Sequence, residues 1–330
     1  MSTSEGTMLA ARYPTGGESA GALAVVEMAR PEPGPGEVLV RVRVSGVNPT
    51  DWKVRRTGGN AKVAEDVVPN QDGAGEIVAV GDGVDPGRVS ERVWLWEGQW
   101  QRPQGTAAQW IALPAHQAVA LPANASFGLG AGLGIPAITA HLCLFADGPL
   151  ADAQVLVHGG AGAVGHAAIE LARWRGARVA TTVSSDEKAE LARAAGAELV
   201  VNYRSEPAAD VIREWAADGV SRIVEVNLPA NAALNTEVLA DGGVVSCYVA
   251  PDRSVELSRS LMVLNAHFSF VLVYTAPLEA KLAAVADISQ ALREGVLTAL
   301  PEHRFTLEQI AAAHDAVEQG ATGKVLVEIP

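Results

Sequence analysis

The stretch that decides the fold is QVLVHGGAGAVG, residues 154–165. An apolar run ends there at a glycine-rich turn, and residues 166–175 continue with the pattern of a helix. Gly160, Gly162 and Gly165 have the spacing G-x-G-x-x-G, in which the first glycine permits a tight turn, the second a close approach of a pyrophosphate, and the third the packing of helix against strand. Backbone N–H groups at a helix start bind phosphate. The stretch therefore predicts a dinucleotide site that also includes Ala161, Ala163 and Val164, with a purely structural turn as the alternative.

The end of the next strand indicates which dinucleotide is bound. Residues 177–183 predict a second strand that ends at Ser184, with Lys188 one turn into the following helix and Tyr203 after the third strand. Enzymes that prefer NAD usually carry Asp or Glu at this strand end, to bind the ribose 2′-hydroxyl. Small polar residues and a cation suit a 2′-phosphate instead. Asp186 is the exception, and we interpret it as a helix cap or dipole partner. The pattern favours NADPH.

Composition limits the classes of partner. The chain has 330 residues, of which 48% are hydrophobic, and a formal net charge of −13. This size and composition suit a two-domain α/β enzyme, and the acidic balance argues against nucleic acid or an anionic membrane as the main partner. We expect no apolar run to reach the length of a membrane span, and the first residues lack the pattern of a signal peptide. We expect a cytoplasmic protein whose only cysteines, Cys143 and Cys247, are buried thiols.

The order of predicted elements indicates an α/β protein with a β-rich first part. Strands are predicted at residues 38–44, 76–80, 93–96 and 108–113, and a buried helical stretch, interrupted near Pro136, at residues 127–145. Strands then alternate with helices, which implies a parallel sheet covered on both faces. The predicted strands are 155–157, 178–183, 199–201, 223–226 and 244–249, and the predicted helices 166–175, 187–195, 207–216 and 232–239. Two later helices, 278–292 and 307–319, and a strand at 323–329 complete the pattern.

Several motifs in order resemble one known family. They are VNPTDWKVR at 47–55, GAGEIVAVG at 73–81, GIP at 134–136 with Thr139-Ala140, the loop at 160–165, NYR at 202–204, DGG at 241–243 and GATGK at 320–324. Over nearly its whole length the chain resembles the zinc-independent quinone oxidoreductases of the medium-chain dehydrogenase/reductase superfamily, typified by zeta-crystallin. The resemblance implies a GroES-like β-rich catalytic domain at residues 1–126, a Rossmann NADP-binding domain with a doubly wound parallel sheet at 127–272, and a segment at 273–330 that returns to the catalytic domain. SERV at 90–93 departs from the family's usual Gly-Asp-Arg-Val and puts the local turn in doubt.

The resemblance also suggests chemistry without a metal. Zinc-dependent members of the superfamily carry a cysteine where Asn48 stands, a His-Glu pair where Gln71 and Asp72 stand, and a loop with four cysteines. Catalytic zinc needs about three ligands from Cys, His, Asp or Glu, and the two cysteines of this chain lie elsewhere. The histidines show no ligand spacing and are interpreted as surface or hydrogen-bonded residues: His116, His141, His158, His166, His267, His303 and His314.

The activity implied is hydride transfer from NADPH to a quinone, which becomes an aromatic hydroquinone without the help of a metal. A reductase of enones, enals or 2-enoyl thioesters on the same scaffold is the alternative. A non-enzymatic role, as an RNA-binding or crystallin-like protein, is a third interpretation, and the acidic balance weakens it. By the same resemblance, the strands near residues 244–249 and 268–273 would form a homodimer or homotetramer.

Two candidate catalytic residues follow from the resemblance. In this family the nicotinamide lies in the cleft between the domains beside the Asn-Pro loop, so Asn48 would donate its amide to the developing oxyanion. The alternative for Asn48 is an Asx-type turn ahead of Pro49. Lys53 stands where relatives commonly have a tyrosine near the cofactor. Its ammonium group would stabilise an oxyanion or donate a proton; a solvated or cofactor-contacting position is the alternative.

The remaining candidates bind substrate or cofactor. Tryptophan is concentrated in the first domain, where Trp52 and above all Trp100, in a polar stretch, are candidates for stacking on a flat quinone. Hairpin packing is the competing explanation. The cofactor contacts implied by resemblance, each of which has a structural alternative, are Thr139, Asn227, Cys247, Tyr248, Val249, Val271, Leu272, Val273, Gly320 and Lys324.

Overall fold

The computed structural model describes residues 6–15, 21–57 and 66–330, and the chain divides into two compact units. Unit 1 comprises Met1–Ile135 and Pro301–Pro330, and unit 2 comprises Pro136–Leu300. The first five residues, on which the expectation of no signal peptide rests, lie outside the described residues. The domain boundaries at 126/127 and 272/273 remain a prediction.

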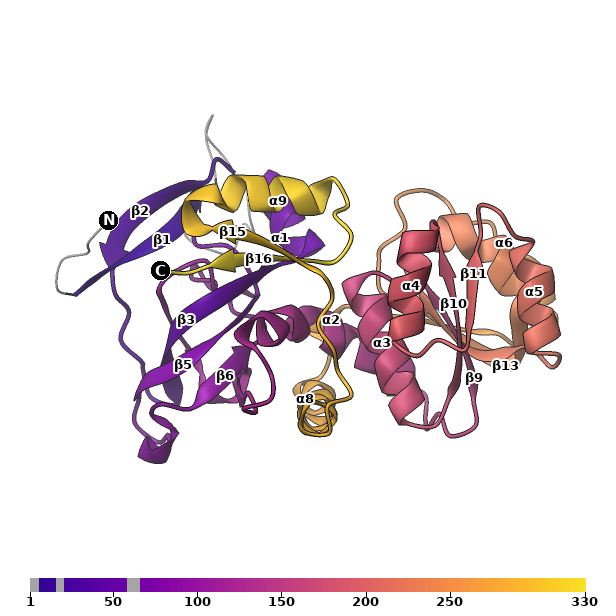
Figure 1. Cartoon of the computed structure of the whole chain (residues 1–330), viewed down its shortest axis with the longest axis horizontal. Helices are drawn as coiled ribbons and strands as arrows, with labels where there is room; N and C mark the ends of the chain where they lie inside the picture. The colour runs from indigo at the N-terminus through magenta and orange to yellow at the C-terminus, as the bar shows by residue number, and fades with distance from the viewer. Residues whose placement is uncertain (1–5, 16–20, 58–65) are drawn as a thin grey trace. The chain divides into compact units, whose positions relative to one another are not determined.

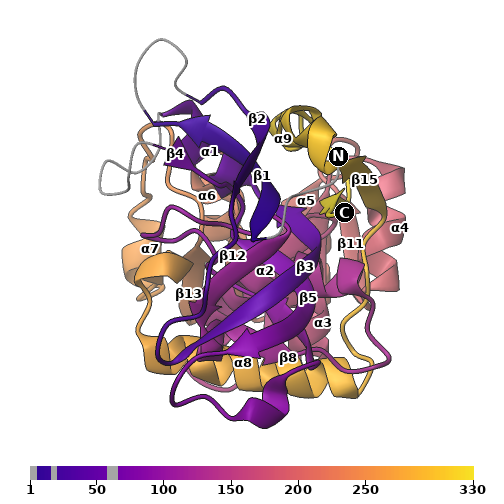
Figure 2. The same cartoon turned by 90° about the vertical axis from the view of Figure 1, so that its left-hand side faces the viewer.

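Unit 1 is built mainly from antiparallel strands. Its strands are β1 Thr7–Pro14, β2 Ala24–Ala29, β3 Glu37–Val47, β4 Asp66–Val67, β5 Asp72–Val80, β6 Arg92–Leu95, β7 Trp110–Pro114, β8 Ala118–Ala120, β15 Glu302–Thr306 and β16 Lys324–Glu328. Its helices are α1 Pro49–Arg56 and α9 Ile310–Glu318, with short helical turns η1 Pro86–Arg88, η2 Ala115–Gln117 and η4 Leu307–Gln309. Strands β2-β1-β4 form a small sheet, and the order β15-β16-β3-β5-β6-β8, with β7 on β3, forms a seven-stranded one. Strands β3 and β5 run side by side within it (Figure 2).

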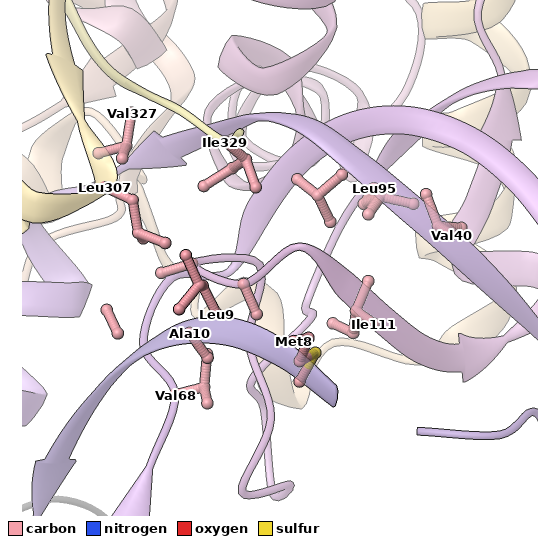
Figure 3. Close-up of a cluster of buried hydrophobic side chains, with 14 of the residues drawn as sticks. Met8, Leu9, Ala10, Val40, Val68, Leu95, Ile111, Leu307, Val327 and Ile329 are labelled. Carbon is pink, nitrogen blue, oxygen red and sulfur yellow. The ribbon is translucent and has the colours of Figure 1, made fainter. Parts of the chain in front are cut away.

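One hydrophobic core joins the two ends of the chain in unit 1. Met8 and Leu9 of β1 are buried with Leu307 and Val327 of the C-terminal segment, and Ile111 of β7 belongs to the same cluster (Figure 3). Strand β16 pairs antiparallel with β3, and α9 lies against β15 and β16 (Figure 1). The segment that follows unit 2 is therefore part of the first core, which sequence periodicity could not show because the contacts are non-local.

The turn at residues 90–93, whose sequence departs from the family pattern, begins with a residue in the left-handed backbone conformation. Ser90 has φ 72°, the region that favours glycine because a Cβ crowds the following carbonyl. Its N–H donates to the carbonyl of Ile77 at 2.8 Å, which ties the turn to β5. The serine therefore occupies a backbone position that favours glycine.

Unit 2 is a parallel sheet covered by helices. Its strands are β9 Gln154–His158, β10 Arg178–Val183, β11 Leu199–Asn202, β12 Val220–Glu225, β13 Leu239–Cys247 and β14 His267–Phe270. Its helices are α3 Ala163–Trp174, α4 Asp186–Ala194, α5 Ala208–Trp215, α6 Leu228–Val238, α7 Ser260–Val263, α8 Leu278–Arg293 and the short turn η3 Val273–Thr275. The strand order is β11-β10-β9-β12-β13-β14, with all pairs parallel. Helices α3 and α4 lie on one side of the strands and α5 and α6 on the other (Figure 1). The expected α/β fold, GroES-like and Rossmann-like, is confirmed.

Helix α2, Phe127–Phe145, corrects two expectations. It is continuous, with Pro136 inside it, whereas an interruption near Pro136 was expected. The helix is almost entirely buried, so packing outweighs the cost of about 3 kcal/mol that an interior proline carries. It is also long and apolar enough to cross a membrane, contrary to the expectation that no run reaches that length. Since 83% of its apolar window is buried inside the protein, it is explained as a core helix.

Candidate active site

The glycine-rich turn connects β9 to α3, as the sequence predicts. A Cβ on Gly165 would lie 2.3 Å from the carbonyl oxygen of Gly159, so only glycine lets the helix pack this closely on the strand end. A Cβ on Gly160 would lie 2.3 Å from Oγ1 of Thr181. The left-handed residue of the turn is Gly159, with φ 74°, and the expectation that Gly160 permits the tight turn is corrected accordingly.

The start of α3 is suited to phosphate. Within the described chain, the N–H groups of Ala163, Val164 and Gly165 have no acceptor, because the first helical bond runs from His166 to the carbonyl of Gly162 at 2.8 Å. Gly162 is exposed at the N-cap, and a Cβ there would meet only the carbonyl of Gly159, at 3.4 Å. Three open donors beside an uncovered backbone fit the pyrophosphate of a dinucleotide.

The end of β10 brings together the residues expected to bind the ribose 2′ position of the coenzyme. Lys188 of α4 donates its ammonium to the hydroxyl of Ser184 at 3.2 Å. Strand β11 pairs with β10 up to Asn202, so Tyr203, which is half exposed, follows at the neighbouring strand end. Asp186 is the first residue of α4 and accepts from the amide of Asn202 at 3.3 Å. A hydroxyl and a cation thus stand at this strand end, and the acid is engaged by a neighbouring amide.

The other candidates in unit 2 lie near the carboxyl ends of the parallel strands. Asn227, two residues after the end of β12, is the N-cap of α6, and Cys247 is the last residue of β13. The pKa of the Cys247 thiol is raised to about 12, first by burial and then by Glu225, so it is protonated at neutral pH. Tyr248 and Val249 follow β13, and Val271 follows β14. Leu272 is exposed, and Val273 begins η3. Thr139, by contrast, is buried in α2.

A buried polar network that sequence reasoning did not single out lies at the same carboxyl ends of the strands. The carboxylate of Glu225 is fully buried and accepts from the N–H of Asn227 at 2.5 Å and from the amides of Asn231 and Asn235 at 2.8 and 2.6 Å. Oδ1 of Asn235 in turn contacts Nε2 of His158 at 2.8 Å. The signal available in the sequence was one acid in the predicted strand 223–226, whose other residues are apolar, followed by asparagines at helical spacing.

Unit 1 contains a second buried polar cluster, around Asn48. The side-chain amide of Asn48 donates to Oδ2 of Asp72 at 2.6 Å, and its carbonyl oxygen accepts from the ammonium of Lys324 at 2.7 Å. The backbone N–H of Asn48 donates to Asp51 at 2.7 Å, which is the reciprocal half of a capping box at α1. The other oxygen of Asp72 accepts from the N–H of Ile135 at 2.8 Å. Asn48 is thus held by a network rather than by a simple turn, and one of its two amide hydrogens remains for another acceptor.

Burial decides the charges of this cluster. The pKa of Asp51 is raised to about 8, mainly by burial; the backbone N–H of Asn48 opposes this shift and nearby Asp72 adds to it. The pKa of Asp72 is raised to about 6 by burial, against the opposing ammonium of Lys324 at 3.9 Å. Burial also lowers the pKa of Lys324. With its ammonium engaged by Asn48 and Asp72, Lys324 acts here as an internal cation, and its expected contact with the cofactor stays a prediction, as does that of Gly320, which is exposed with φ 80°.

The candidate substrate side chains are less enclosed. Lys53 is exposed on α1, with its ammonium 5.7 Å from the centre of the ring of Trp52. Trp52 and Trp100 are partly buried. Trp94 and Trp96 are fully buried, so hairpin packing explains these two tryptophans.

The positions that hold zinc ligands in related enzymes are otherwise engaged. The side chain of Gln71 donates to Oε1 of Gln99 at 3.0 Å and accepts from its N–H at 3.2 Å. In residues 6–15, 21–57 and 66–330, no group of three or more His, Cys, Asp or Glu side chains is placed to hold a metal ion.

Comparison with known proteins agrees with this architecture. Residues 34–123 match the alcohol dehydrogenase GroES-like domain, and residues 163–287 match the zinc-binding dehydrogenase family. The chain is 31% identical to quinone oxidoreductase from Rattus norvegicus over 306 residues, which cover 90% of each protein. It belongs to the quinone oxidoreductase family of the medium-chain dehydrogenase/reductase superfamily.

Other relatives of this quinone oxidoreductase family member support the same assignment. The human quinone oxidoreductase is 28% identical over 91% of this chain and 92% of the human protein. An alcohol dehydrogenase superfamily protein from Novosphingobium aromaticivorans is 27% identical with TM-score 0.85, covering 98% of this chain and all of that one. A mycobacterial protein solved in complex with NADPH is 26% identical with TM-score 0.82, covering 97% and 99%. The chain is therefore an oxidoreductase of this family.

The raised pKa of Asp51 predicts a pH dependence of stability. An acid whose pKa is higher in the folded state binds more protons there, so the free energy of unfolding falls as pH rises from 3.8, the ordinary value, to about 8. Asp51→Asn keeps an oxygen acceptor for the N–H of Asn48 and removes this term. We expect its free energy of unfolding to exceed that of the wild type at pH 8 by roughly a few kcal/mol, with a much smaller difference at pH 4.

Urea denaturation from pH 4 to 8 measures this difference, with Asp241→Asn, at an exposed position of β13, as the control. Parallel stability curves for Asp51→Asn and the wild type would contradict the assignment.

Proposed function

We propose that this protein is an NADPH-dependent quinone oxidoreductase that works without a metal. The observation that carries the cofactor assignment is the pair Ser184 and Lys188, joined at 3.2 Å at the end of β10. A phosphate placed there would receive a hydroxyl and an ammonium donor, whereas no aspartate or glutamate occupies the strand-end position that serves NAD. The open donors of α3 would hold the pyrophosphate.

Zinc independence is proposed from the donor set around Asn48. Asn and Gln stand where related enzymes place thiolate and imidazole ligands, and both are poor ligands for zinc. The ammonium of Lys324 lies 2.7 Å from Oδ1 of Asn48, where it would repel a divalent cation. Lys324 would then supply in part the positive charge that zinc supplies elsewhere.

The bound coenzyme supplies hydride, and the chain supplies orientation and charge. In this proposal the second amide hydrogen of Asn48 is offered to the oxygen of the acceptor that becomes negative. Lys324 polarises that amide through its carbonyl oxygen, which strengthens the amide as a donor. A quinone needs only this modest support, because reduction gives an aromatic hydroquinone.

An enone, enal or 2-enoyl thioester reductase is the second candidate. Lys53 favours it, because this exposed ammonium replaces the tyrosine common in relatives and changes how a proton would reach the product.

An RNA-binding or crystallin-like role is the weakest proposal, since the chain carries a net charge of −13. A cytoplasmic location is likewise proposed.

The choice between acceptors is tested by following NADPH oxidation with a naphthoquinone, a short enone and crotonyl-CoA. We expect the quinone to be reduced fastest, and the rate to be unchanged after dialysis against a strong chelator. Rapid turnover of the enone with none of the quinone would establish the alternative. Loss of activity on chelation that added zinc restores would refute the metal-free proposal.

Lys188→Ala tests the coenzyme assignment. Because the ammonium would pair with the 2′-phosphate alone, we expect the Kd for NADPH to rise about tenfold and the Kd for NADH to change less than twofold. Fluorescence titration of both coenzymes measures this, with Arg193→Ala on the same helix as the control. Equal losses for both coenzymes would show that Lys188 does not recognise the phosphate.

We also propose a homodimer or homotetramer assembled through the edge strand β14. Its outer edge has no strand partner among the described residues, and Met262, Val263, Phe270 and Leu272 are exposed in this region of unit 2. Exposed apolar side chains along a sheet edge are the pattern of an interface. Light scattering that gave a monomeric mass at micromolar concentration would contradict the assembly.

A further inference from the structure

Glu225 lies at the point where the strand order of the sheet reverses. From β9 the chain proceeds to β10 and β11 on one side, and then crosses to β12 on the other. In open α/β sheets, ligands bind outside the carboxyl ends of the strands at such a switch point. Glu225 ends β12, and His158 ends the adjacent β9 immediately before the glycine turn. The residue therefore lies beneath the expected ligand crevice, and the proposed function gives it no role.

The carboxylate of Glu225 is the acceptor in each of the hydrogen bonds described above. Its three partners, the backbone N–H of Asn227 and the amides of Asn231 and Asn235, are neutral donors. Because Asn235 donates its amide to Glu225, its oxygen is left to accept from Nε2 of His158. The ring then carries hydrogen on Nε2.

The other ring nitrogen indicates that His158 is neutral. Nδ1 of His158 lies 2.9 Å from Oγ1 of Thr182, which is itself buried. No other acceptor for this hydroxyl is found in the described chain, so Thr182 donates to an unprotonated Nδ1. An imidazolium would leave the buried hydroxyl hydrogen without an acceptor.

The network as a whole is consequently anionic. Among the residues that the structure describes, no lysine or arginine forms an ion pair with Glu225, and its one basic neighbour is the neutral His158 at 3.6 Å. Burying a carboxylate without a cation is costly, even when hydrogen bonds satisfy it. In a medium of low dielectric, such a charge acts strongly on any positive charge that forms nearby.

We propose that Glu225 is a fixed negative charge that stabilises the oxidised, positively charged nicotinamide relative to the reduced form. Its backbone partner in the sheet is Cys247, which begins the segment 247–249 that would flank the nicotinamide. The inference rests on the proposed coenzyme function. It makes Glu225 a residue that favours hydride donation without contacting the acceptor.

The test compares the Kd values of NADP⁺ and NADPH for the wild type and Glu225→Gln, measured by calorimetry. Removing the charge should weaken NADP⁺ about tenfold more than NADPH. Glu225→Asp retains the charge and should keep the wild-type ratio. Asn235→Ala breaks the network at a neutral link, and should weaken both forms to the same extent.

A Glu225→Gln ratio within twofold of the wild type would overturn the proposal. The unmodified protein gives a second measurement if that variant does not fold. Wild-type protein should bind NADP⁺ at least as tightly as NADPH, and tenfold preference for NADPH would also overturn the proposal. Wild-type protein that bound neither coenzyme would instead refute the coenzyme function on which the inference rests.

Discussion

The close packing of α3 on the end of β9 is the constraint on which the rest of unit 2 depends. The backbone at Gly165 approaches the carbonyl of Gly159 so closely that a Cβ would lie 2.3 Å from that oxygen. This approach brings the start of α3 to the carboxyl end of β9, where three backbone N–H groups remain without acceptors in the described chain. It also fixes His158 one residue before the turn, and through His158 the network that ends at Glu225. In the proposed function, phosphate binding and the buried charge would thus both depend on one tight turn.

Unit 1 depends on a contact of another kind, between residues far apart in sequence. Lys324 and Asn48 are 276 residues apart, and their bond forms because β16 pairs with β3 in the same sheet. The core that buries Met8 with Leu307 holds this pairing in place (Figure 3). The return of the chain after unit 2 therefore does more than complete a sheet, because it delivers the cation that offsets Asp72.

How much the sequence could predict follows from this difference. The glycine-rich turn between β9 and α3, and the strand β10 that follows, are local, and periodicity and spacing predicted them, although the left-handed residue is Gly159. The contact of Lys188 with Ser184 was not predicted. Strands β1 and β2 were not predicted, and neither was the cluster joining Asn48 to Asp72 and Lys324, because these form by pairing across long separations. Glu225 was missed for another reason: a single acid in the predicted strand 223–226 indicates no role until its partners on the next helix are known.

The two buried clusters differ in the sign of the charge that they would favour. Around Asn48, Lys324 places a cation beside the carbonyl oxygen of the amide, and this arrangement favours negative charge at the amide hydrogens. Around Glu225, neutral donors surround a lone carboxylate, and this arrangement favours positive charge. Hydride transfer creates both charges together, a negative one on the acceptor and a positive one on the coenzyme. In the function proposed here each cluster would stabilise one of the two, so that a metal-free enzyme divides between two sets of side chains the electrostatic support that zinc concentrates at one point.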